Sequence, residues 1–207
     1  MKRIFSLAMG VVYLALMVAP VFAAEGVAVI KGTSTDSPIS GEVKFKETEK
    51  GLTVEAKLKN VPNSRKLGFH IHENGSCDDM GKAAGGHYNP MSAPHGFLAK
   101  DGEHKAHAGD LGNIKIANDG TGTLKGFLPG ISLRGGQYNV EGRAIILHEK
   151  QDDFGQPTGN AGGRIGCGII KIEEIKRTYT CPMHPNVHQT SPGACSECGM
   201  ELIEETK

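Results

Sequence analysis

Residues 68–110 have the sequence GFHIHENGSCDDMGKAAGGHYNPMSAPHGFLAKDGEHKAHAGD. This segment contains six of the chain's nine histidines and ends on an acidic residue. Its ligand-capable side chains are His70, His72, His87, His95, His104, His107 and Asp110. Imidazole nitrogens combined with a carboxylate suit a first-row divalent metal. A merely solvated loop would not need so many histidines, so the segment predicts a metal centre.

The start of the segment has the alternation of a β-strand. His70 and His72 alternate with Phe69 and Ile71. Residues two apart in a strand share a face, so both imidazoles point one way and both apolar side chains point into the opposite layer. Residues 73–109 show no sustained period. Long ordered loops in compact domains are usually functional, which agrees with a metal centre there.

Short stretches with strand-like patterns flank the segment on both sides. We expect strands at residues 27–30, 42–47, 52–58, 67–72, 111–117, 121–127, 143–149 and 166–172. Residues 49–51 and 118–120 have the composition of hairpin turns. No helical period of useful length is present in this part of the chain. About eight short strands predict an all-β fold, either an antiparallel sandwich or a barrel.

Charge and length limit the classes of function. The 23 Lys and Arg residues balance the 23 Asp and Glu residues, so the formal net charge is +0. This balance gives no indication of a nucleic-acid or membrane-surface partner. The length of 207 residues suits one ordinary domain with a small appendage.

The first 23 residues resemble a signal peptide. Lys2 and Arg3 precede an apolar run from Ile4 to Val18, and small residues follow, with cleavage expected after Ala23 or Ala24. The alternative is a membrane anchor, but the apolar core is short for a ~20-residue span and no basic cluster follows it. We therefore expect a periplasmic or secreted protein with no membrane span after signal removal.

The five cysteines fall into two groups. Cys77 and Cys167 lie in the body of the chain, whereas Cys181, Cys195 and Cys198 lie near its end. Disulfides persist in exported proteins. One disulfide plus a separate three-cysteine group is the economical division, although cysteine counting alone does not fix the pairing.

Residues 179–203 are predicted to form a small metal-binding knuckle after a charged linker at 174–178. Cys181 and His184 are two residues apart, as are Cys195 and Cys198, which is the spacing of a tetrahedral zinc-type site. The stretch is similar to the heavy-metal-binding modules of copper-transporting ATPases and efflux proteins. We expect metal capture beside the main domain, with zinc or copper(I) as the metal. A structural zinc knuckle and a Cys195–Cys198 disulfide are the alternatives.

Five sequence blocks in the body of the chain closely resemble the copper/zinc superoxide dismutases of the exported bacterial type. The blocks are GFHIHE (68–73), GGHYNP (85–90), HAGDLGN (107–113), LHEKQDD (147–153) and GNAGGRIGCGII (159–170). The resemblance covers residues 25–173. It implies an eight-stranded antiparallel Greek-key β-barrel with immunoglobulin-like sandwich architecture, and members occur as monomers and as homodimers.

The resemblance also implies one copper and one zinc ion per chain. Copper would be held by His70, His72, His87 and His148. Zinc would be held by His87, His95, His107 and Asp110. His87 would bridge both metals, and the outer-shell Asp152 would link a copper ligand to a zinc ligand. A disulfide between Cys77 and Cys167 is implied as well. His104 has no counterpart among the ligands, and we expect it to be solvated.

The implied activity is conversion of superoxide to dioxygen and hydrogen peroxide, with His87 taking up a proton. Arg164 would attract and orient the anion beside copper, because a guanidinium is always charged. The loop between His148 and Arg164 is short, and Lys150 is its only lysine. The sequence therefore does not predict how well the surface around the site steers superoxide. Two alternatives are a copper-delivery protein on the same fold and a scaffold for the metal-binding tail.

Overall fold

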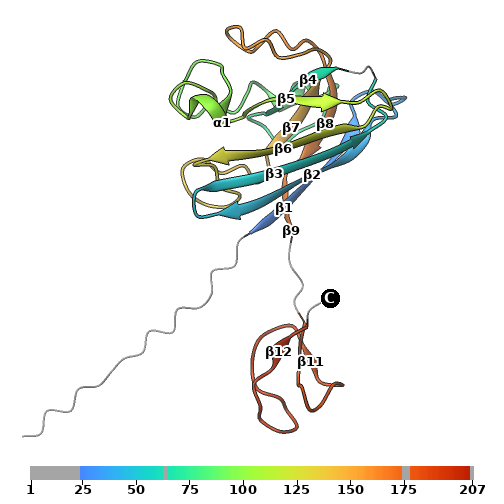
Figure 1. The fold of residues 1–207 in the computed structure, drawn as a ribbon, viewed down its shortest axis with the longest axis vertical. Coiled ribbons are helices and arrows are strands. Elements are labelled where there is room, and N and C mark those ends of the chain that lie inside the picture. The colour runs from blue at the N-terminus through green and yellow to red at the C-terminus, as the bar shows by residue number, and fades with distance from the viewer. Residues whose placement is uncertain (1–23, 63–64, 174–177, 206–207) are drawn as a thin grey trace, which may run out of the picture.

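The computed structural model describes residues 24–62, 65–173 and 178–205. The predicted signal peptide and all but the last residue of the predicted linker lie outside the described residues. Nine strands form the main sheet (Figure 1): β1 (Glu25–Gly32), β2 (Ser40–Thr48), β3 (Gly51–Lys59), β4 (Lys66–Ile71), β5 (Asp110–Ile116), β6 (Gly122–Pro129), β7 (Ala144–His148), β8 (Arg164–Ile169) and β9 (Lys171–Glu173).

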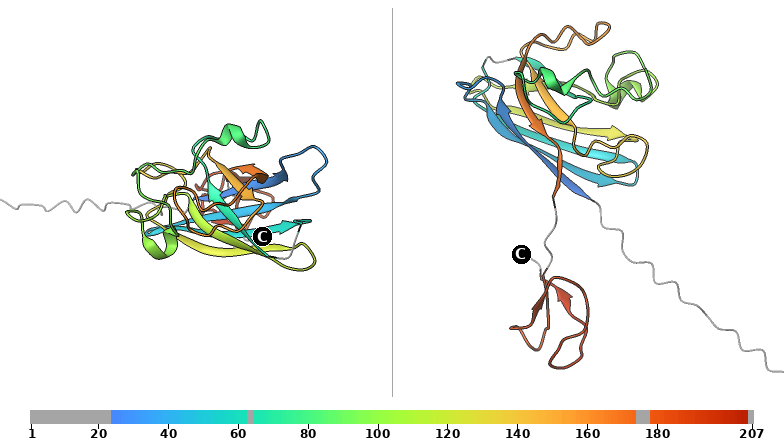
Figure 2. Two further views of the ribbon diagram at one scale, coloured as in Figure 1. Left: turned by 90° about the horizontal axis from the view of Figure 1, so that it is seen from above. Right: turned by 180° about the vertical axis from the view of Figure 1, so that it is seen from behind.

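The sheet closes into a barrel. Its strand order is β2-β3-β6-β5-β4-β7-β8-β1, and β1 also pairs with β2. The short β9 follows β8 after a break at Ile170 and continues the pairing with β1. In this order β3 lies beside β6 rather than β4, and β7 lies beside β4 rather than β6, which are Greek-key connections. The predicted eight-stranded antiparallel Greek-key barrel is therefore confirmed (Figure 2).

Alternating side chains fill the barrel. In β3, Leu52, Val54, Ala56 and Leu58 are buried while the residues between them are mostly exposed. Burying each of these leucine and valine side chains contributes roughly 1.5–3 kcal/mol before entropy is counted. In β4 the alternation places Phe69 and Ile71 in the same core. His70 is therefore left on the outer face of the barrel wall, as the sequence predicts.

Two long loops cover this outer face. The connection from β4 to β5 contains two short helices, the 3-10 helix η1 (Lys82–Ala84) and α1 (Leu98–Asp101). Each is too short to produce a helical period in the sequence. The connection from β7 to β8 spans residues 149–163. Because both loops pack over β4, His70 is fully buried although it faces away from the barrel core.

A disulfide fixes the first loop to the barrel. Cys77 and Cys167 are bonded, with Cα atoms 5.7 Å apart. Cys77 lies in the β4–β5 loop and Cys167 in β8, so the bond joins the loop to the strand that begins with Arg164. This is the pairing that the family resemblance implied.

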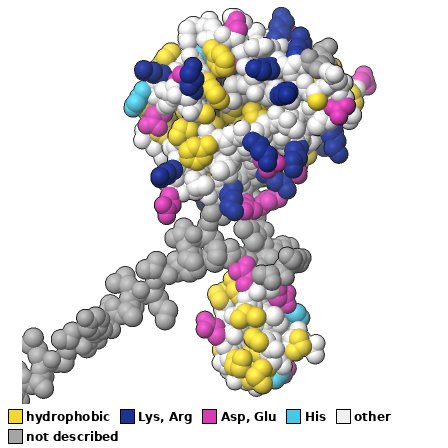
Figure 3. Space-filling view, viewed as in Figure 1, with side chains coloured by type: hydrophobic (Ala, Val, Ile, Leu, Met, Phe, Trp, Pro, Cys, Tyr) yellow, Lys and Arg dark blue, Asp and Glu magenta, His cyan; other side chains and the backbone are white. Residues whose placement is uncertain are grey.

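The C-terminal residues form a second, separate sheet. Strands β10 (Tyr179–Thr180), β11 (His188–Gln189) and β12 (Ile203–Glu204) pair in the order β11-β10-β12 and share no pairing with the barrel. Cys181, Cys195 and Leu202 form their small core. Residues 178–205 include four glutamates and no lysine or arginine. On the face drawn in Figure 3, the lysine and arginine side chains are spread over the barrel instead. Among the described residues, no helix has the length and apolar character needed to cross a membrane.

Candidate metal centre

The loops and β4 bring seven of the predicted site residues into two adjoining clusters. In each cluster the ligand atoms lie within 4.8 Å of one another, and every member is buried. The first cluster consists of His70, His72, His87 and His148. The second cluster consists of His87, His95, His107 and Asp110. His87 belongs to both clusters, so the two clusters adjoin through one side chain.

Backbone hydrogen bonds hold the loop histidines against the end of β4. The amide of Ile71 donates to the carbonyl of Gly109 (2.9 Å), and its carbonyl accepts from the amide of Tyr88 (2.9 Å). His87 and His72 form an isolated antiparallel bridge. His87 and His107 are thereby placed beside the strand histidines, although they are distant from them in sequence.

The first cluster contains only imidazoles. Nε2 of His72 lies 3.4 Å from Nε2 of His148, at the end of β7. The rings of His70 and His87 lie 4.2 Å apart between centroids. Nδ1 of His72 donates to the carbonyl of Gly85 (3.0 Å), which leaves Nε2 as its free nitrogen. Nitrogen donors of this kind suit copper and zinc.

The second cluster surrounds a carboxylate. Oδ1 of Asp110 lies 2.9 Å from Nδ1 of His87 and 3.2 Å from Nδ1 of His107. Oδ2 lies 2.9 Å from Nδ1 of His95. Oδ2 also accepts hydrogen bonds from the amides of Gly96 and His107. Three imidazoles and one carboxylate make a closed N/O set of the kind that binds zinc tetrahedrally.

Two buried nitrogens show that this arrangement fits bound cations. Nδ1 of His70 and Nδ1 of His95 have no hydrogen-bond partner, although both atoms are buried. His95 Nδ1 lies close to Asp110, but its direction does not match a hydrogen bond. Buried polar groups without partners are rare in native structures and need an explanation. Metal ions that accept the lone pairs of these nitrogens supply that explanation.

Burial keeps three histidines of the first cluster uncharged at neutral pH. It lowers the pKa of His72 to about 2, of His148 to about 3 and of His87 to about 4. The positive charge of Arg164 also lowers the pKa of His72 and His148. Metal binding requires neutral imidazole, so protons compete weakly with a cation at this site. In the second cluster burial opposes ionisation, but close contacts with the imidazoles of His107, His87 and His95 keep the pKa of Asp110 below its ordinary value.

Asp152 connects the two clusters from behind. Its Oδ2 lies 2.9 Å from Nε2 of His70, and its Oδ1 lies 3.0 Å from Nε2 of His95. A carboxylate on the outer nitrogen fixes the tautomer, so that Nδ1 of each ring faces its cluster. Asn113 holds Asp152 in turn, because its side chain exchanges two hydrogen bonds with the Asp152 backbone (2.9 and 2.8 Å). We did not predict Asn113 from sequence, since a lone asparagine in a strand gives no signal.

Gly159, the first residue of the block at 159–170, is a second supporting residue whose role we did not predict. Its φ is 76°, a conformation that favours glycine. A Cβ at this position would collide with Oδ1 of Asp152 and with Nε2 of His95. The close approach of the loop backbone therefore encloses the Asp152–His95 contact.

Arg164 begins β8 beside the first cluster. Its guanidinium donates to the carbonyls of Gly81 and Gly85 in the disulfide-bonded loop. Gly85 O also accepts the hydrogen bond of His72, so Arg164 and His72 share one acceptor. Burial lowers the pKa of Arg164 from its ordinary value, yet a guanidinium with so high a pKa stays charged at neutral pH.

Three histidines lie outside the two barrel clusters: His104, His184 and His188, of which His104 is solvated as expected from the sequence. His104 is exposed on the β4–β5 loop and belongs to neither cluster. His188 is exposed in β11, where its Nδ1 lies 2.7 Å from Oε1 of Glu205.

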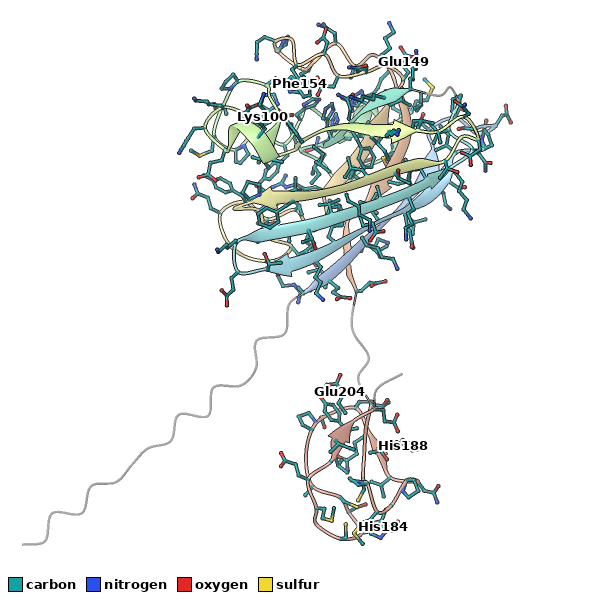
Figure 4. All side chains as sticks on the ribbon, in the orientation of Figure 1. Lys100, Glu149, Phe154, His184, His188 and Glu204 are labelled. Carbon is teal, nitrogen blue, oxygen red and sulfur yellow. A yellow bond between two sulfur atoms is a disulfide. The ribbon has the colours of Figure 1, made fainter. Side chains whose placement is uncertain are left out.

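A third cluster lies in the C-terminal module. It consists of Cys181, His184, Cys195 and Cys198, again with ligand atoms within 4.8 Å. All three thiols are free, so the alternative of a Cys195–Cys198 disulfide is not what the structure shows. Figure 4 shows His184 among the sulfur atoms at one end of the module and Glu204 at the other end.

The family model of copper/zinc superoxide dismutase matches residues 39–170. The chain belongs to the copper/zinc superoxide dismutase family. Three relatives illustrate its likeness to other members of this dismutase family. Superoxide dismutase [Cu-Zn] 2 of Aquifex aeolicus is 35% identical over 67% of this chain and 82% of its own length. Superoxide dismutase [Cu-Zn] A of Xenopus laevis is 40% identical over 64% and 89%. The extracellular superoxide dismutase of Caenorhabditis elegans is 42% identical over 61% and 59%.

A solved structure and a second family model complete the comparison. The crystal structure of the clock protein EA4 matches this dismutase with a TM-score of 0.65 and 32% identity, over 75% of this chain and 98% of that one. The heavy metal binding domain model matches residues 178–205. The protein is thus a superoxide dismutase that uses copper and zinc and carries a heavy metal binding domain. The alternatives of a copper-delivery protein and of a scaffold lose their support.

Proposed function

We propose that this dismutase is exported and that its two clusters hold the two metals. Copper is held by His70, His72, His87 and His148. Zinc is held by His87, His95, His107 and Asp110. The observation that carries this assignment is the pair of clusters sharing His87, in which the buried Nδ1 atoms of His70 and His95 lack hydrogen-bond partners.

The metals and the chain have separate roles. When bound, copper supplies the one-electron exchange that converts superoxide to dioxygen and hydrogen peroxide, whereas zinc, a d¹⁰ ion, supplies charge and geometry. His87 presents Nδ1 to Asp110 and His107, which leaves Nε2 for the first cluster. We assign to Nε2 of His87 the uptake and return of a proton. Asp152 keeps His70 and His95 in the tautomers that bind metal.

Arg164 captures the substrate in this proposal. Its guanidinium is close enough to depress the pKa of His72 and His148, so its charge acts on the first cluster. The carbonyls of Gly81 and Gly85 hold it in one orientation. A fixed cation at the mouth of a site raises the local concentration of a small anion and its rate of association.

Several observations support export and a two-part mature chain. Residues 1–23 have the pattern of a cleaved signal. The Cys77–Cys167 disulfide suits an oxidising compartment. One relative, the Caenorhabditis elegans enzyme, is named extracellular. We propose a periplasmic or secreted protein with a dismutase domain at 25–173, a linker at 174–178 and a metal-capturing module at 179–203.

Metal analysis of three matched variants tests the ligand assignment. The mature chain is loaded with copper and zinc, and both metals are counted by elemental mass spectrometry. His148→Asn should lower retained copper more than zinc, and His107→Asn should lower zinc more than copper. His104→Asn, which changes an exposed histidine on the same loop as His107, should retain both. Equal retention in all three variants would contradict the assignment.

A further inference from the structure

Three of the six distances among the four donor atoms of the C-terminal module match a tetrahedron around one small ion, and all four atoms lie within 4.8 Å of one another. Nδ1 of His184 lies 3.6 Å from Sγ of Cys181 and 3.6 Å from Sγ of Cys195. Sγ of Cys181 lies 3.6 Å from Sγ of Cys198. With zinc–sulfur bonds of ~2.3 Å and zinc–nitrogen bonds of ~2.05 Å, a regular tetrahedron requires sulfur–nitrogen distances of ~3.6 Å and sulfur–sulfur distances of ~3.8 Å. The module therefore matches zinc without any large movement.

The loops that carry the cysteines are built to hold thiolates. The amide of Glu197 points at Sγ of Cys195 (3.4 Å). The amide of Gly199 donates to the carbonyl of Cys195 (2.8 Å), and the amide of Cys195 donates to the carbonyl of Met200 (2.7 Å). Gly199 has a φ of 74°, which closes the turn. These contacts fix the second pair of ligands before any metal arrives.

The soft thioethers of the module lie outside this site. Met183 is 66% exposed and Met200 is 39% exposed, so both present much of their surface to solvent. Copper(I) prefers thiolate and thioether ligands and low coordination numbers. A two-coordinate ion would hold its donors on opposite sides, farther apart than the thiols observed. A convergent set of three thiols and one imidazole favours zinc instead.

A carboxylate stands behind the only imidazole of the site. Nε2 of His184 lies 3.5 Å from Oε2 of Glu197, while its Nδ1 faces the sulfurs. A carboxylate on the outer nitrogen of a metal-binding histidine fixes the tautomer and raises the basicity of the ligand. In the barrel, Asp152 makes closer, buried contacts of this kind with Nε2 of His70 (2.9 Å) and Nε2 of His95 (3.0 Å).

We propose that the module is a closed zinc site with Cys181, His184, Cys195 and Cys198 as its four ligands and Glu197 as the residue that positions His184. The proposal rests on the metal-capturing role proposed above and names its metal. The module then retains zinc beside the enzyme, and the copper of the protein resides in the barrel.

Cobalt(II) substitution of the full mature chain tests the metal class. Thiolate ligands give cobalt(II) a charge-transfer absorption that the all-imidazole and carboxylate sites of the barrel do not produce. We expect this absorption, tetrahedral visible bands, and loss of the charge-transfer absorption once zinc is added in excess of the amount that the barrel binds. Preferential retention of copper(I) by the thiols in the presence of equal zinc would overturn the proposal. Copper and zinc counts and dismutase activity in the same samples report separately on the barrel.

Glu197 is tested against a neighbouring glutamate. Glu197→Ala should weaken zinc binding at the thiolate site by about tenfold in competition with a chelator, and Glu197→Gln should restore part of it, since an amide oxygen still accepts a hydrogen bond. The control Glu201→Ala removes the same charge from an exposed residue and should leave the affinity unchanged. Equal affinities for Glu197→Ala and Glu201→Ala would remove Glu197 from the proposal. An intact cobalt spectrum in each variant shows that the module still folds.

Discussion

Oδ2 of Asp152 lies 2.9 Å from Nε2 of His70, and both side chains are fully buried. Oδ1 of the same carboxylate serves His95 in the other cluster. One buried carboxylate therefore orients a histidine in each cluster, so a change at Asp152 affects both clusters.

Replacing Asp152 should weaken both metal sites together. In Asp152→Ala, His70 and His95 lose the acceptor that fixes their tautomers, so we expect copper and zinc affinity to fall by about ten- to hundredfold. Competition with chelators measures both affinities. Asp36→Ala, a change at an exposed aspartate, is the control. Loss of one metal with full retention of the other would contradict the shared role.

Replacing Arg164 should slow catalysis without removing metal. Arg164→Ala should lower kcat/KM for superoxide by about tenfold at low salt, because the anion loses a fixed cation beside the first cluster. Rapid-mixing kinetics over a range of ionic strength measure kcat/KM. Its dependence on ionic strength should be weaker in the variant. The control is Arg134→Ala, which removes an exposed guanidinium paired with Glu141. Unchanged kinetics at full copper content would rule out the assigned role.

Removing the disulfide should destabilise the metal-free barrel. The bond joins residues 90 apart in sequence, so the chain-entropy model predicts a loss of about 4 kcal/mol in the free energy of unfolding. Urea unfolding of the Cys77→Ser/Cys167→Ser double variant measures it. Treating both proteins with reductant is the control, since only the unsubstituted chain should respond. A change below about 1 kcal/mol would contradict the model for this loop.

The metal-free protein should lose stability as the pH falls from 7 to 5. Burial keeps the pKa values of His72, His148 and His87 in the folded chain well below the value of about 6.5 for an exposed histidine. Below that value the unfolded chain binds protons that the folded chain does not, so acid favours unfolding. Burial opposes protonation of His95 as well, but Asp110 and Asp152 raise its pKa to about 9, which acts in the opposite direction.

Three histidines outweigh one in this balance, so the urea midpoint of the metal-free chain should be lower at pH 5 than at pH 7. The metal-loaded protein is the comparison, because bound metal excludes the competing protons. An equal or higher midpoint at pH 5 for the metal-free chain would show that His72, His87 and His148 are not held neutral by the fold.

Export should yield a chain that begins at Ala24 or Glu25. Intact-mass spectrometry of the exported fraction measures this cleavage directly. Leu14→Arg, which places a charge in the apolar run, should keep the precursor inside the cell, while Leu14→Ile should not. An uncleaved N-terminus on the exported protein would indicate an anchor instead.

Much of the barrel could be predicted from sequence because its signals are local. Leu52 to Leu58 alternate with polar residues, and residues 118–120 form a hairpin turn, so strands and turns were found where the structure has them. The break at Ile170 that separates β9 from β8 was not predicted, since the strand pattern continues through it.

The support of the site was harder to predict, because it depends on contacts across the fold. Most of the histidines and Asp110 lie in one segment, residues 68–110, and so high a density of possible ligands could be recognised from sequence. Asn113 acts through Asp152, and Gly159 approaches both Asp152 and the distant His95, so only the folded chain shows which residues they contact. The same holds for Glu197, whose relation to His184 depends on how the two knuckles meet.

The carbonyl of Gly85 accepts hydrogen bonds from both His72 and Arg164. A single oxygen thus supports a side chain assigned to copper and the side chain assigned to the substrate. Any insertion or substitution that shifts this peptide displaces both partners at once. Natural variation that moves this peptide in the disulfide-bonded loop therefore changes metal retention and anion capture together. Across variants of the loop, the two quantities should rise and fall in parallel.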